Sequence, residues 1–141
     1  MEPWIIYAIA SAIFAALVSI LMKMGTQSLD SDVATFYRTI IVVFMSLAFL
    51  LLQKKPLGIG ETSSREMIFV VLSAICTGLS WFAYFRAIQL GPVSQASLID
   101  KSSVVLIVLA GILLFGEPLT LKTGLGMGLI IAGMFVLFVK W

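Results

Sequence analysis

The chain has 141 residues, of which 61% are hydrophobic and only 11% are charged. Soluble domains are about half apolar and about a quarter charged, so this composition excludes an ordinary water-soluble domain and predicts lipid as the solvent. The net charge of +2, without a basic cluster, excludes nucleic acid as a partner. Because the chain has no His and a single cysteine, Cys76, we expect no metal, no other cofactor and no internal disulfide.

Five long apolar runs divide the chain. Each has about 19–23 residues, which as a helix spans the ~30 Å hydrocarbon core of a bilayer. The runs cover residues 4–22, 33–52, 67–88, 93–115 and 121–139. The first run follows the acidic Glu2 rather than a basic segment, so we interpret it as a retained span and not as a secretory signal. Since the connections are short, we expect one all-α transmembrane domain, 1–141, with five helices that are antiparallel in sequence order.

The connections carry residues that begin and end helices. Asp30 is suited to cap the second helix, and Ser63 with Glu66 forms a capping box before the third. Further signals are Gly91-Pro92 before the fourth helix, Gly116-Glu117-Pro118 after it, and Thr120 before the fifth. These signals support the predicted helix boundaries.

Two charged residues, Asp100 and Lys101, lie side by side in the fourth run, about 11–12 Å from its nearer end. A charge at such a depth costs roughly 2.5–3.5 kcal/mol on insertion scales and usually faces a protein interior or an aqueous cavity. At 100° per residue, Ser94 and Ser97 share about a 120° arc with this pair. We therefore predict a polar entrance on this face of the fourth helix.

Proton-coupled transport requires a site at which substrate binding and proton binding compete. Asp100, alone or with Lys101, is the deep titratable choice in this chain. We predict that Asp100 is the coupling carboxylate and that Lys101 is its partner or a substrate contact.

Other polar and aromatic residues are expected in the same half of the membrane. Arg38 is about 8 Å inside the second span, and Arg86 is close to the end of the third. Trp81 and Tyr84 share a face of the third helix, where rings beside cations favour planar or cationic groups. These residues either line the solute pathway or serve the fold. In the second case Arg38 or Arg86 pairs with Asp100, and the aromatic rings form an interfacial belt.

The orientation in the membrane is weakly specified. The Lys/Arg bias of short loops orients a membrane protein. The N-terminal side has Lys54, Lys55, Arg65 and Lys122, whereas the other side has Lys23 and Lys140, with Arg38 and Arg86 within reach. Either the N-terminal side is cytoplasmic, or the chain inserts in both orientations. Dual insertion predicts an antiparallel homodimer, since inverted repeats are a common transporter architecture.

The fifth run is rich in glycine. Gly124 and Gly128 form a Gly-x-x-x-Gly motif, followed by Gly133, and such a face allows two helices to approach closely in lipid. This face either packs within the chain or lies near the centre of a dimer, and we predict the dimer contact.

Four segments carry a resemblance to a known family: Phe36-Tyr37-Arg38-Thr39, Tyr84-Phe85-Arg86-Ala87-Ile88-Gln89-Leu90-Gly91, Ile99-Asp100-Lys101-Ser102-Ser103-Val104-Val105 and Leu114-Phe115-Gly116-Glu117-Pro118-Leu119-Thr120. In order and spacing, and with the glycine-rich last run, they are similar to the EamA-like half of the drug/metabolite transporter superfamily. The chain resembles its short bacterial and archaeal five-span form. The resemblance implies secondary transport, usually export, by two inverted halves around a central cavity in a prokaryotic inner (cytoplasmic) membrane.

Other interpretations remain open at this level. Glu117 is either functional or a loop carboxylate that helps to end a helix. The whole chain is alternatively a non-transporting membrane subunit, or a flippase for a lipid-linked small molecule. An enzyme is not expected, because one deep carboxylate without His provides none of the usual catalytic arrangements.

Overall fold

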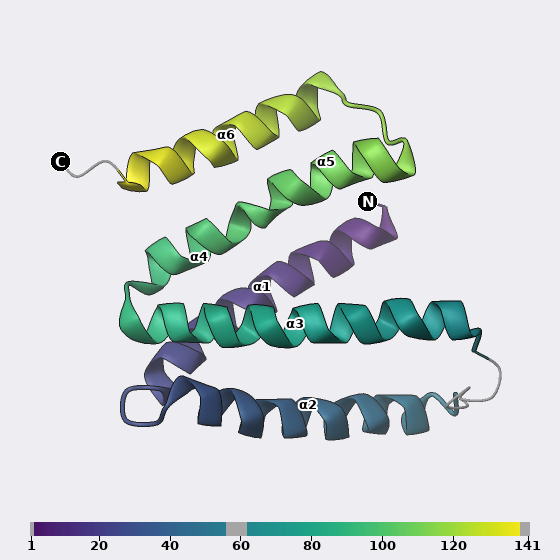
Figure 1. Ribbon diagram of the computed structural model, residues 1–141, viewed down its shortest axis with the longest axis vertical. Coiled ribbons are helices and arrows are strands. Elements are labelled where there is room, and N and C mark those ends of the chain that lie inside the picture. The colour runs from purple at the N-terminus through teal and green to yellow at the C-terminus, as the bar shows by residue number, and fades with distance from the viewer. Residues whose placement is uncertain (1, 56–61, 139–141) are drawn as a thin grey trace. The chain divides into compact units, whose positions relative to one another are not determined.

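The computed structural model describes residues 2–55 and 62–138, and the regular secondary structure in these ranges is entirely helical. The chain forms two compact units, Met1–Leu90 and Gly91–Trp141. The helices are α1 (Pro3–Gly25), α2 (Ser31–Leu52) and α3 (Ser64–Leu90) in the N-terminal unit, and α4 (Val93–Lys101), α5 (Ser103–Phe115) and α6 (Leu121–Phe138) in the C-terminal unit (Figure 1). Val139, where the fifth predicted span ends, and Lys140 lie outside the described residues.

α3 is the central helix of the N-terminal unit, because it packs against both α1 and α2. The buried side chains gather at one end of this packing. Phe85 and Ile88 near the end of α3 are buried, and so are Ser31 and Thr35 at the start of α2. The N-terminal unit is therefore held most tightly where α3 ends and α2 begins.

In the C-terminal unit, α6 packs along both α5 and α4. α5 ends at Phe115, and Gly116 follows in the left-handed conformation with φ +67°. The N–H groups of Gly116 and Glu117 both donate to the carbonyl of Gly111, the latter at 3.1 Å. This closure satisfies carbonyl groups that a helix end leaves without partners.

The predicted caps are confirmed. Asp30 Oδ1 accepts a hydrogen bond from the Asp32 N–H at 2.8 Å and begins α2. Glu66 Oε2 accepts from the Ser63 N–H at 3.0 Å, which is the reciprocal bond of a capping box. Thr120 Oγ1 accepts from the Thr123 N–H at 3.2 Å and begins α6.

Four helical segments are long and apolar enough to cross a membrane, namely α1, α2, α3 and the stretch Val93–Phe115. α3 is longer than predicted, with 27 residues, because its capping box and Gly91-Pro92 set its ends. The apolar stretch of α6, Leu121–Val136, is shorter within the described residues. Most large apolar side chains are exposed in the protein, as expected where lipid is the solvent.

The fourth predicted span is interrupted at Ser102, whereas the sequence predicts one helix. The Ser102 N–H donates to the Ile99 carbonyl and the Val105 N–H donates to the Ser102 carbonyl, both at 3.0 Å. These bonds join residues three apart, so the helix tightens locally at this position. Ser102 and Ser103 directly follow the charged pair.

Candidate functional site

Asp100 and Lys101 form an ion pair in the last turn of α4, with Lys101 Nζ 3.2 Å from Asp100 Oδ2. The Asp100 side chain is 35% exposed and that of Lys101 is 60% exposed. On the same helix, Ser94 is exposed and Ser97 is half-buried. Within the chain, this ion pair is therefore not sealed in a core.

The pair lies beside the tightened turn at Ser102. The backbone keeps right-handed helical dihedral angles there, with φ −61° and ψ −21°, so the chain passes from α4 into α5 without leaving the helical region. The charged pair therefore lies within one apolar stretch, Val93–Phe115, where the pattern of backbone hydrogen bonds changes.

Arg38 on α2 lies against aromatic rings of α3. Its Cζ is 4.0 Å from the centroid of the Trp81 ring and 4.5 Å from that of Phe85. The structure thus brings Arg38 together with Trp81 and with Phe85, which is 1% exposed. Such cation–π contacts are worth about 0.5–2 kcal/mol each.

The guanidinium group of Arg38 retains unused hydrogen-bond donors. Nε and Nη2 each have less than 1 Å² of accessible surface, and neither has a hydrogen-bond partner among the described residues. A buried donor without an acceptor costs about 1–3 kcal/mol, and more when it is charged. The two ring contacts offset part of this cost but provide no acceptor in the plane of the guanidinium.

Tyr84 holds α3 against α1. Its hydroxyl group is 2.7 Å from Ser19 Oγ. Ser19 Oγ donates to the Ala15 carbonyl at 3.0 Å, so in this arrangement it accepts the hydrogen bond from Tyr84. Ser19 is buried. These contacts favour the interpretation that Tyr84 serves the fold.

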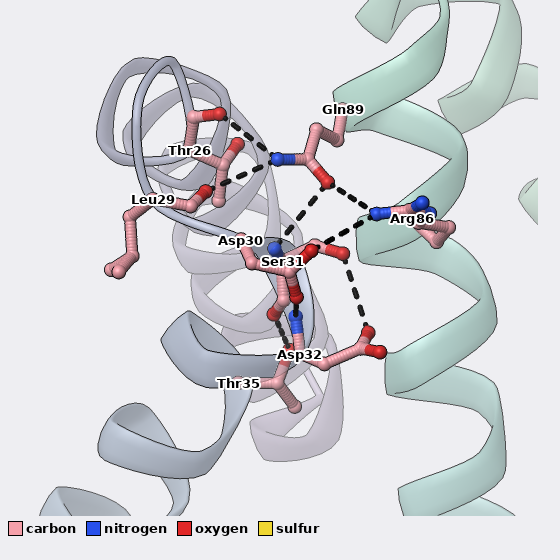
Figure 2. A network of polar contacts seen from close by, with 8 residues as sticks. All are labelled: Thr26, Leu29, Asp30, Ser31, Asp32, Thr35, Arg86 and Gln89. Atoms are coloured by element: carbon pink, nitrogen blue, oxygen red, sulfur yellow. Dashed lines mark hydrogen bonds and ion pairs between the residues drawn. The ribbon is translucent and has the colours of Figure 1, made fainter.

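Arg86 joins the end of α3 to the start of α2 (Figure 2). Its Nη1 lies 3.2 Å from Asp30 Oδ2, and both side chains are 51% exposed. The same nitrogen donates to Gln89 Oε1 at 3.0 Å. An exposed ion pair is worth about 0–1 kcal/mol, so this contact orders the segment more than it stabilises the protein.

Gln89 and Lys23 complete a set of contacts that we call the α1–α2 clasp. Gln89 Nε2 donates to the carbonyls of Thr26 at 3.2 Å and Leu29 at 3.1 Å, and Gln89 Oε1 accepts from the Ser31 N–H at 3.3 Å (Figure 2). Lys23 Nζ donates to the carbonyls of Ile88 at 2.7 Å and Gln89 at 3.3 Å. The clasp therefore fixes the connection between α1 and α2 on the end of α3.

Sequence reasoning did not identify the roles of Gln89 and Lys23. The available signals are local: Gln89 lies just before Gly91-Pro92, and Lys23 lies in the last turn of α1. Neither signal predicts a partner far away in the sequence, such as Ile88, which accepts from Lys23 and is 65 residues away. Only the packing of α1 and α2 on α3 brings these groups together.

Glu117 folds back over the end of α5. A Cβ atom added to Gly111 would lie 2.7 Å from Glu117 Oε2. Together with the bond from the Glu117 N–H to the Gly111 carbonyl, this close approach favours a role in ending the helix. The sequence left this role and a functional one open.

The Gly124/Gly128 face of α6 is open within the C-terminal unit, because a Cβ atom added to either residue would meet nothing within 4 Å. Gly133 is open as well, but at 100° per residue it lies about 140–180° from this face. The contacts of α6 with α4 and α5 therefore do not use the closest approach that these glycines permit.

Comparison with known proteins gives two matches. The model of the EamA-like transporter family matches residues 2–139. A protein of Sinorhizobium sp. with the name "Uncharacterized transporter in cobO 3'region" is 36% identical over 138 residues, which cover 98% of each chain. No solved structure matches.

Proposed function

We propose that this chain, which belongs to the EamA-like transporter family and is a multi-pass membrane transporter, acts as a secondary transporter that exports a small metabolite or toxic solute in exchange for protons. Family membership confirms the resemblance drawn from the sequence, and the related protein is likewise named a transporter. We place the chain in the inner (cytoplasmic) membrane of a prokaryote.

The observation that carries this proposal is the ion pair of Asp100 and Lys101 at the interruption of an apolar span. Protonation of Asp100 would neutralise the carboxylate and weaken its attraction to Lys101. A solute group that binds the ionised Asp100, such as an ammonium group, would compete with the proton for this carboxylate, and this competition couples the two fluxes. Ser94 and Ser97 on α4 would line the same pathway.

Alternating access would use two copies of the chain. One copy supplies a five-helix half, and an oppositely inserted copy would supply the inverted half. The near-even distribution of Lys and Arg supports dual insertion. The open glycine face of α6 supports a contact between the copies.

The proposed function is tested with purified protein in proteoliposomes. A panel of radiolabelled amino acids, organic acids and lipophilic cations is offered with and without a pH gradient. We expect gradient-driven accumulation of at least one solute. Failure of every solute to move would favour a non-transporting subunit, and movement of a fluorescent lipid-linked sugar alone would favour a flippase.

The role of Asp100 is tested by Asp100→Asn, which keeps the size of the side chain and removes its titration. We expect this variant to lose gradient-driven accumulation while remaining folded. Asp32→Asn makes the same change in an exposed acid at the start of α2 and is the matched control. A folded Asp100→Asn protein with an unaltered pH dependence would show that Asp100 is structural.

A further inference from the structure

The guanidinium group of Arg38 presents one complete edge without an acceptor. Nε–H and an N–H of Nη2 point in the same direction along one side of the planar group, and these two nitrogens have no partner in the described residues. The Cζ lies over the rings of Trp81 and Phe85. Because the guanidinium is planar, its remaining donors are directed within its own plane, and neither ring provides an acceptor there.

The chemistry of this edge selects one kind of ligand. Two parallel N–H donors match two oxygen atoms of one carboxylate or phosphate, and such bidentate bonds are short and strong because both groups are charged. A single neutral acceptor would satisfy only one donor and leave the charge unpaired. A cation would be repelled by Arg38.

We propose that the Nε/Nη2 edge of Arg38 is an oxyanion-binding site, and that the transported solute carries a carboxylate or phosphate group which binds there. This inference rests on the proposed transport function, and it adds the class of substrate. The Trp81 ring keeps the guanidinium in place, so that its edge is oriented before the anion arrives. Since the two nitrogens are buried, the anion must displace whatever atoms cover them.

Trp81 supplies a local readout, because its ring is 4.0 Å from the Arg38 Cζ. In a Trp4→Phe/Trp141→Phe background of the full chain, Trp81 is the remaining tryptophan. The emission of Trp81 is titrated in maltoside micelles, which contain no phosphate, with butyrate, butyramide, inorganic phosphate and a short-chain phosphatidic acid. No ion gradient is present, so binding is measured independently of transport.

We expect a saturable change in Trp81 emission with butyrate or inorganic phosphate and none with butyramide, which has the same shape without the charge. Arg38→Lys keeps the positive charge and loses the paired edge, so we expect affinity to fall at least about tenfold. Arg38→Gln should abolish the response. Arg65→Lys, in an exposed arginine at the start of α3, is the matched control and should bind as the background protein does.

Several results would overturn the inference. They are equal responses to butyrate and butyramide, no response to either soluble anion, or full affinity in folded Arg38→Lys. A response to the phosphatidic acid alone would replace the solute with a lipid headgroup. If Arg38→Lys does not fold, the test is the background protein: a response to butyrate but not to butyramide supports the anion site, and equal responses contradict it. Anion binding without transport would contradict the proposed function and retain the site, whereas transport without anion binding would contradict only the site.

Discussion

Gln89 shows how one side chain can fix a connection between helices. Its amide satisfies main-chain groups of Thr26, Leu29 and Ser31, and it also accepts a hydrogen bond from Arg86. Ser31 is 0% exposed, so water cannot replace the bond to its N–H group. The side chain thus links the end of α3 to the segment that begins α2.

We expect Gln89→Ala to lower the free energy of unfolding by about 1–3 kcal/mol, because it leaves a buried N–H group without an acceptor. Unfolding by SDS in maltoside micelles measures this change. Gln53→Ala, in an exposed glutamine after α2, is the control and should be within about 0.5 kcal/mol of the wild type. Equal stability of the two variants would mean that the α1–α2 clasp does not hold the connection.

At the scale of the helix, the end of α5 depends on a backbone conformation that favours glycine. Gly116 has φ +67°, and an L residue with a side chain is strained there. The nearby Gly111 differs, because a Cβ atom at Gly111 would meet only the end of the flexible Glu117 side chain. Substitution of Gly116 is limited by its backbone conformation, whereas substitution of Gly111 is limited only by the Glu117 side chain, which can move.

We expect Gly116→Ala to destabilise the protein by about 1–2 kcal/mol, the usual cost of the left-handed conformation for an L residue. Thermal unfolding followed by circular dichroism provides the measurement. Gly78→Ala lies in the interior of α3 with nothing within 4 Å of the new Cβ. It should be neutral or stabilise by up to about 1 kcal/mol. If Gly78→Ala destabilised the protein and Gly116→Ala did not, the left-handed conformation of Gly116 would not be what requires glycine there.

α4, which contains Asp100 and Lys101, shows how far side-chain directions can be predicted from a period of 100° per residue. The arc shared by Ser94, Ser97, Asp100 and Lys101 assumes a regular helix, and this holds because α4 contains all of these residues. The assumption fails immediately afterwards, at Ser102. Directions predicted for α4 therefore cannot be extended into α5 at 100° per residue.

At the scale of the whole molecule, orientation depends on a small difference in charge. We expect reporter proteins fused to the C-terminus to be active on both sides of the membrane, because Lys and Arg are nearly balanced. Adding two or three Lys beside Arg65 at the start of α3, on the side that already has more Lys and Arg, should force one orientation and reduce transport, unless an oppositely biased copy is present. Reporter activity confined to one side of the membrane would contradict dual insertion.

The proposed dimer places the Gly124/Gly128 face of α6 between two copies. We expect Gly128→Leu to weaken the dimer, because the larger side chain separates the two backbones. Gly126→Leu is the control, since at 100° per residue Gly126 points about 160–200° away from this face. Crosslinking and mass measurement in nanodiscs compare the variants. An undiminished Gly128→Leu dimer would exclude this placement.

The sequence by itself determined the helical class, the ends of most helices and the position of Asp100 and Lys101 within an apolar stretch. These properties follow from local causes, namely the length of each apolar run and the capping residues beside it. The family also followed from the order of short segments. The sequence placed Arg38 and Trp81 in the same half of the membrane, but it did not predict the contact between them.

Only the tertiary structure decided which partners each polar side chain has. In the structure, Arg86 forms an ion pair with Asp30, and Tyr84 forms a hydrogen bond with Ser19. Gln89 forms hydrogen bonds with the connection between α1 and α2. The physical reason is that these contacts depend on how each helix is rotated about its axis and packed on α3, which no local pattern of residues specifies. The unpaired edge of Arg38 has the same origin, since the packing of α2 on α3 places its donors where the described residues supply no acceptor.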